Sequence, residues 1–112
     1  MDTGQARATI TGTMSATLFS VLSSGRHHIT RGVISVTVGS GAGIVEIAQT
    51  NAAGSSVGSA LFACSSSTPG LHAFDLGDRG YVCEASSRII ANYTGGAVGS
   101  AVAVALCVGY AR

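Results

Sequence analysis

The pattern of hydrophobic and polar residues has a period of two over most of the chain. In the segment GVISVTVGS, Ile34, Val36 and Val38 fall on one face of an extended chain. Ser35 and Thr37 fall on the other face, and the β-branched residues are typical of a half-buried strand. No window of about 11 residues shows the apolar spacing of an amphipathic helix, and Gly or Ser interrupts nearly every stretch. The pattern predicts an all-β protein.

Turn and loop signals separate these short strands. Residues 40–43, with the sequence SGAG, tolerate positive φ, so we expect residues 32–38 and 44–49 to form a β-hairpin with a loop of about four residues. The only proline, Pro69, lies in the turn STPG. Further strands are predicted in ATITGT, TLFSVLSS, HHITRGV, ALFACSS, LHAFDL, YVCEAS and RIIANYT. About eight short strands at this spacing favour an antiparallel β-sandwich or a small barrel over a βαβ protein.

The closing segment, residues 96–110, is nearly uncharged and raises the question of a membrane helix. It is shorter than the roughly 20 apolar residues that a spanning helix needs, and glycines interrupt it. Read with a period of two, one face carries large residues such as Val102 and Leu106, and the other carries small ones such as Ala103 and Cys107. This pattern predicts a strand buried on both faces, whose small face allows the close approach of a second sheet or a neighbouring subunit.

Length and composition predict one domain with a charge-poor surface. We expect an N-terminal arm and the first strand or strands in residues 1–25, and the sandwich in residues 26–112. The first residues, MDTGQARATITG, are expected to form an arm that orders on a partner. Charged residues make up 10% of the chain and Lys is absent, which indicates either burial against other chains or a compositional bias toward Ala, Gly, Val and Arg.

Charge also excludes classes of partner. The net charge of +1, with no run of like charges, argues against binding to nucleic acid and against a polybasic membrane-surface segment. The N-terminus has no charged-then-apolar arrangement of a signal peptide, so we expect synthesis and assembly in the cytoplasm.

The sequence offers no catalytic, cofactor-binding or metal-binding motif. His27 and His28 are adjacent, so on a strand they point to opposite faces and do not share a metal ion easily. His72 with Cys64 and Cys83 lacks the ligand spacing of a zinc site, and each cysteine lies in an apolar stretch that favours a free, buried thiol. No serine lies in GxSxG, and the glycine-rich VGSGAG lacks the lysine and the helix of a phosphate loop. A non-enzymatic protein without a cofactor is predicted.

The order of these segments carries a family resemblance. A strand with a TV pair is followed by a TNAAGSS loop, an FDL step, a GDRGYVCEAS hairpin and a final alternating strand that ends near a tyrosine. Over residues 30–110 this order resembles small β-sandwich structural proteins of tailed-bacteriophage virions, of the capsid decoration, cement or head-fibre type. The resemblance implies a jelly-roll-like sandwich, often a homotrimer. Such a protein binds the major capsid protein or another virion protein and stabilises the capsid lattice.

The resemblance therefore implies a virion component that is assembled in the host cytoplasm. The alternative is a phage tail or fibre module that binds a host receptor or glycan, although a chain without Trp offers few aromatic rings for sugar stacking. A hydrolase or metal enzyme would rest on the abundant serines and the histidines alone. We expect exposed polar residues at one end of the sandwich to contact the partner, and for each one a solvated turn charge is the simpler alternative. These candidates are Arg26, His27, His28, Arg31, Asp78, Arg79 and Arg88.

Overall fold

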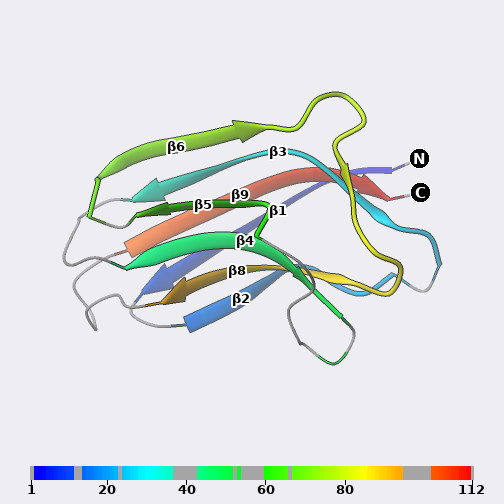
Figure 1. Ribbon diagram of the computed structural model, residues 1–112, viewed down its shortest axis with the longest axis horizontal. Helices are drawn as coiled ribbons and strands as arrows, with labels where there is room; N and C mark the ends of the chain where they lie inside the picture. The colour runs from blue at the N-terminus through cyan, green and yellow to red at the C-terminus, as the bar shows by residue number, and fades with distance from the viewer. Residues whose placement is uncertain are drawn as a thin grey trace.

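The computed structural model describes residues 2–11, 14–22, 24–36, 43–51, 53, 60–65, 67–94 and 102–111. Within these residues the chain forms strands and no helix (Figure 1). The strands are β1 (Asp2–Thr11), β2 (Met14–Phe19), β3 (His27–Val36), β4 (Ile44–Thr50), β5 (Phe62–Ser65), β6 (Gly70–Asp75), β7 (Tyr81–Val82), β8 (Arg88–Thr94) and β9 (Val102–Ala111). None of the described segments is a helix that could cross a membrane.

The described strands form two antiparallel sheets, one behind the other in Figure 1. Sheet A has the order β1-β9-β3-β6, with the short β7 also paired to β3, and sheet B has the order β2-β8-β4-β5. Each sheet alternates strands from the early and late parts of the chain, which is the strand order of a jelly roll. The predicted antiparallel, jelly-roll-like β-sandwich is confirmed.

The predicted hairpin between residues 32–38 and 44–49 is wrong. Strand β3 pairs with β6, β7 and β9, whereas β4 pairs with β5 and β8, so the chain passes from sheet A to sheet B between them. Both strands still bury their apolar faces, and Ile34 and Ile47 meet in the space between the sheets. A glycine-rich signal marks a change of chain direction, but it does not say whether the next strand returns to the same sheet or enters the facing one.

Residues 2–11, which lie in the expected N-terminal arm, form β1 and pair with β9 from Asp2 opposite Ala111 onward. Strand β2 from the same part of the chain belongs to sheet B and pairs with β8. Residues 1–25 therefore supply one strand to each sheet. The division of the chain at residue 25 stays a prediction.

The uncharged closing segment is a strand, as its alternation predicted, and β9 lies between β1 and β3 in sheet A. Pairing on both sides satisfies its backbone N–H and C=O groups. The side chains of residues 102–107 lie outside the described residues. The expected small face with Ala103 and Cys107 therefore stays a prediction.

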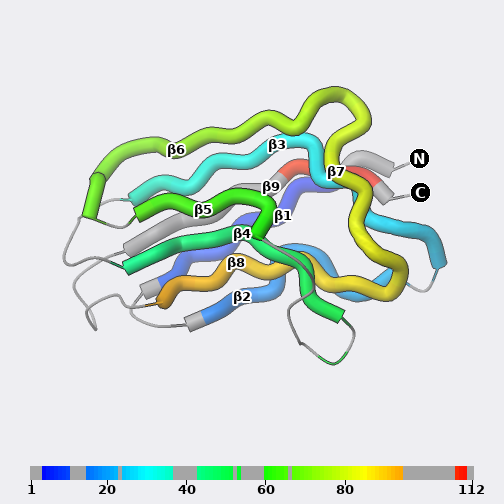
Figure 2. The backbone as a smooth tube through the Cα atoms, in the orientation of Figure 1, coloured from blue at the N-terminus to red at the C-terminus, as the bar shows by residue number. Residues whose placement is uncertain are grey.

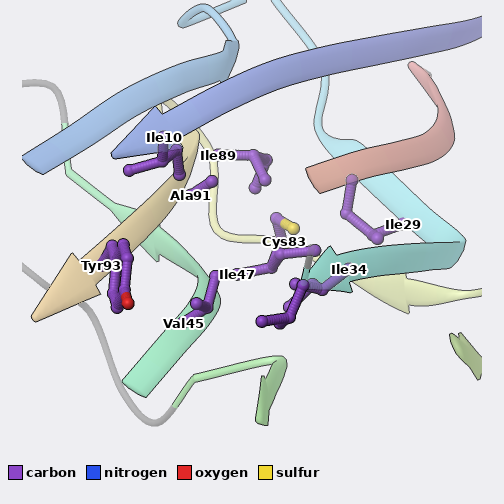
Figure 3. Close-up of a cluster of buried hydrophobic side chains, with 10 residues drawn as sticks. Ile10, Ile29, Ile34, Val45, Ile47, Cys83, Ile89, Ala91 and Tyr93 are labelled. Atoms are coloured by element: carbon purple, nitrogen blue, oxygen red, sulfur yellow. The ribbon is translucent and has the colours of Figure 1, made fainter. Parts of the chain in front are cut away.

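The core is built from side chains that both sheets send inward (Figure 3). The stacked rings of Phe62 in β5 and Phe74 in β6, with centroids 4.8 Å apart, join the two sheets at one side of the sandwich. Cys83 is buried in this core as a free thiol, as predicted from its apolar surroundings in the sequence. The buried cluster consists of Ile10, Ile29, Ile34, Val36, Val45, Ile47, Cys83, Ile89, Ala91 and Tyr93.

Candidate functional site

Three of the residues expected to contact a partner lie on two segments at one end of the sandwich (Figure 2). Arg26 directly precedes β3, and Asp78 and Arg79 lie between β6 and β7. These segments are neighbours because β7 pairs with the first part of β3, where Val82 is opposite His28. All three charged side chains are exposed. The antiparallel register places the connection from β6 to β7 beside Thr30 and Arg31, and Asp78 lines one depression with both of them. Arg26 lies at the other end of this pairing, where the Cys83 amide donates to the His27 carbonyl.

The other two charged candidates lie within strands, Arg31 next to Asp78 at one depression and Arg88 in sheet B. Arg31 is exposed in β3, opposite Asp75 of β6. Arg88 is half-buried at the start of β8, in sheet B, where it is opposite Thr50 of β4. The expected group of seven contacts is thus divided between the end of the sandwich and both of its sheets.

The connection from β6 to β7 is held by backbone hydrogen bonds. The Leu76 amide donates to the Thr30 carbonyl at 2.6 Å, which ties the connection to β3. The Gly77 amide donates to Asp75 Oδ1 at 2.8 Å. The Gly80 amide donates to the Gly77 carbonyl at 3.1 Å and closes a turn. An Asp side chain that accepts from the amide two residues later is a common turn-forming contact.

Gly80 brings this turn into direct contact with β3. Its φ is +65°, a conformation that side chains other than Gly rarely adopt. A Cβ at this position would overlap the backbone carbonyl of Ile29. The close approach fixes the turn against the strand, so Asp78 and Arg79 project into solvent from a firmly placed backbone.

The carbonyl oxygen of Arg79 accepts two hydrogen bonds from sheet A. The Tyr110 hydroxyl donates at 2.8 Å, and His28 Nδ1 lies 3.3 Å away. Because a carbonyl oxygen only accepts, this contact requires the proton on Nδ1 of His28. The two rings are stacked, with centroids 4.4 Å apart and an interplanar angle of 20°. We call Arg79, His28 and Tyr110 the Arg79 clasp, since they join the turn to β3 and β9.

The expected exposure of both histidines is wrong. His27 and His28 have 6% and 8% of their surface exposed. His27 Nε2 donates to the Ser20 carbonyl at 2.7 Å, and its ring lies 5.5 Å from that of Phe19. Each imidazole ring thus has an aromatic neighbour, and one of its N–H groups donates to a backbone carbonyl. That N–H group therefore keeps a hydrogen-bond partner although the ring is buried. The two side chains contact different parts of the protein, as expected for adjacent residues on a strand.

Gln49 has a positioning role that the sequence did not reveal. It is buried in β4 of sheet B, where its Oε1 accepts from the Glu84 amide at 3.0 Å. Its Nε2 donates to the Tyr81 hydroxyl at 3.4 Å. This single side chain therefore ties sheet B to the segment around β7. The signal in the sequence was an amide residue that continues the apolar face of Val45 and Ile47 along β4.

The described thiols are poor nucleophiles. Burial raises the pKa of the Cys83 thiol to about 11 and also raises the pKa of Cys64. Both groups therefore stay protonated at neutral pH, whereas thiol chemistry requires the thiolate. Within the described residues, no three His, Cys, Asp or Glu side chains are placed to hold one metal ion.

Two tyrosine hydroxyls give opposite predictions for the same substitution. The Tyr93 hydroxyl is buried and has no hydrogen-bond partner, whereas the Tyr110 hydroxyl donates to Arg79. Tyr93→Phe removes an unsatisfied polar group, so we expect the free energy of unfolding to stay equal or to rise by about 1 kcal/mol. Tyr110→Phe is expected to lower it by about 1 kcal/mol. Urea denaturation of both variants measures the difference, and an equal loss in both would contradict the assignment of Tyr93.

Comparison with known proteins finds a similar fold among solved structures. No family model matches this chain, and no curated protein matches it. A chain in the acidic stable capsid structure of Helicobacter pylori bacteriophage KHP30 is similar to it, with a TM-score of 0.65 and 11% sequence identity. The alignment covers 96% of this chain and 86% of that one. The likeness is one of fold.

Proposed function

We propose that this chain is a non-enzymatic structural protein of a bacteriophage virion, where it decorates and stabilises the capsid. The observation that carries the proposal is the jelly-roll fold, which is similar over 96% of the chain to a chain of a phage capsid structure. The charge-poor composition, with 10% charged residues, agrees with a surface that is covered by other chains. The proposed partner is the major capsid protein or another virion protein, and the proposed location is the virion after assembly in the host cytoplasm.

The rigid turn of the Arg79 clasp supports a binding role. A surface that is ordered before binding loses less conformational entropy when the complex forms. Arg26 and Arg79 are both exposed, and a guanidinium makes forked hydrogen bonds to a carboxylate. An interface of about 800 Å² per partner is sufficient for stable attachment. An oligomer would also bind a symmetric shell more tightly than a single chain does. Once one of its chains is bound, the others are held at a high effective concentration near their own sites.

Binding to capsids tests the proposed function directly. The purified protein is mixed with expanded, undecorated capsids of the parent phage, and the capsids are recovered by sedimentation. We expect saturable binding in a fixed ratio to the capsid subunits and a higher melting temperature of the capsids, because bound protein stabilises the state to which it binds. Capsids that neither bind the protein nor melt at a higher temperature would overturn the proposal.

Arg79→Ala tests whether the turn contacts the capsid. The substitution removes the guanidinium but keeps the backbone carbonyl that Tyr110 and His28 bind. We expect about tenfold weaker capsid binding, because truncating an interface charge typically costs more than about 1.4 kcal/mol. Arg7→Ala is the matched control, since Arg7 is an exposed arginine on β1. Equal binding by the two variants would exclude Arg79 from the interface.

The oligomeric state is a second part of the proposal. The family resemblance favours a three-fold contact between chains. Size-exclusion chromatography with light scattering counts the chains, and a monomer at every concentration would remove oligomerisation as the reason for the low surface charge.

A further inference from the structure

The outer face of sheet A carries an apolar depression of about 410 Å³ over β3, β6 and β9. Its apolar lining includes Val33, Ala73 and Val108. In β3 the inward position is taken by Ile34, which has no exposed surface, so the neighbouring Val33 faces outward. The depression is therefore on the solvent side of the sheet. It lies next to the connection from β6 to β7, since Arg31 and Asp75 of its lining also line a second depression with Gly77 and Asp78.

The same face of β6 exposes a large hydrophobic side chain. Leu71 has 77% of its surface exposed and lies two residues before Ala73, so both point to the same side of the strand. An exposed leucine beside an apolar depression is a surface that soluble proteins commonly cover with a partner.

Two opposite charges border this apolar surface. Arg31 of β3 and Asp75 of β6 are directly opposite each other in the strand register, and both line the depression and are exposed. The Asp75 carboxylate is held in place, because its Oδ1 accepts from the Gly77 amide at 2.8 Å. The border of the depression thus contains one cation and one anion at neighbouring positions.

We propose that this face binds the same face of a second copy of the chain about a two-fold axis. A two-fold axis between β3 and β6 places the partner's β6 opposite β3 and the partner's β3 opposite β6. Arg31 of each protomer then faces the partner's Asp75, and the apolar surface around Leu71 is covered by the same surface of the partner. The balanced pair of charges makes the face complementary to itself, and that property favours a second copy over an unrelated protein.

The size of the face fits this partner. The molecule measures 40 × 28 × 19 Å along its principal axes, and the sheets lie across the two longer ones (Figure 1). A face of that size accommodates the roughly 800 Å² per partner that a standard interface buries. The test of this inference counts chains in solution, so its outcome does not depend on whether the chain binds a capsid.

Charge reversal tests the two-fold contact. The wild-type protein is expected to form particles with an even number of chains: two, or six if the three-fold contact implied by the resemblance forms as well. Arg31→Asp places two aspartates against two aspartates across the interface, and Asp75→Arg places two arginines against two arginines. We expect each variant alone to show half the wild-type particle mass in light scattering and sedimentation over a range of concentrations.

Mixing the two variants separates the contact between chains from effects within one chain. In the mixed pair, both acidic positions of the Arg31→Asp variant face basic positions of the Asp75→Arg variant, so we expect the wild-type mass to return only in the mixture. The double variant Arg31→Asp/Asp75→Arg is expected to regain the wild-type mass by itself. A change that acted within one chain would not be rescued by mixing. Wild-type particles with an odd number of chains, or single variants with unchanged mass, would overturn the proposal.

The apolar part of the surface has its own control. Leu71→Ser is expected to weaken the two-fold contact at least tenfold, because it removes a large apolar side chain from the covered surface. Ile44→Ser makes the same kind of change at a residue with 50% exposure on sheet B and is expected to leave the particle mass unchanged. Equal effects of the two substitutions would count against the outer face of sheet A.

Discussion

Replacing Gly80 by alanine is expected to lower the free energy of unfolding by about 3 kcal/mol. Two costs add at this position. An L side chain at the observed φ of +65° costs about 1–2 kcal/mol. The new Cβ would also overlap the Ile29 carbonyl, and forcing extra atoms into a close-packed contact costs about 1–3 kcal/mol. The turn would have to move away from β3, so the Arg79 clasp is expected to loosen as well.

Gly77→Ala is the matched control for this prediction. Gly77 also has a positive φ, of +88°, but no atom lies within 4 Å of the position that its Cβ would occupy. Only the backbone cost remains, so we expect a loss of about 1–2 kcal/mol. Urea denaturation of both variants compares the two losses. If Gly77→Ala were as damaging as Gly80→Ala, the close contact between the turn and β3 would be wrong.

Replacing Ile47 by alanine is expected to lower the free energy of unfolding by about 2–5 kcal/mol. Ile47 has no exposed surface and packs in the core between the sheets. Truncation removes buried methyl and methylene groups and leaves a cavity that the surrounding side chains fill only partly. The loss is therefore expected to be a large part of the total stability of a domain of this size.

Ile44→Ala provides the matched comparison, with the same substitution in the same strand. Ile44 is 50% exposed and lies three positions before Ile47, on the opposite face of β4. We expect a loss of less than about 1 kcal/mol, since surface changes rarely cost more. Similar losses in the two variants would mean that the face of β4 is assigned incorrectly. Hydrophobicity alone does not distinguish these two isoleucines.

Three buried polar residues show where reasoning from the sequence falls short. His27 and His28 were expected on the surface because both are polar, yet their rings are buried against backbone carbonyls of Ser20 and Arg79. Gln49 was not singled out, although it bonds both the Glu84 amide and the Tyr81 hydroxyl. In each case the partner is a group remote in the chain, so the sequence around the residue does not show that its hydrogen bonds are satisfied.

The sequence by itself indicated most of the strands and turns of this protein. The exceptions are that HHITRGV and GVISV form the single strand β3, and that YVCEAS contributes only Tyr81 and Val82 to a strand. Alternation marked β3 and β9, and the glycines of GDRG marked the turn before β7, because side-chain period and backbone freedom are local properties. The tertiary structure alone decided which strands pair. It placed β3 and β4 in different sheets, set Arg31 opposite Asp75, and brought the Arg79 carbonyl to Tyr110. Backbone hydrogen bonds between strands are chemically the same for every pair, so the choice depends on how all the apolar faces are buried together.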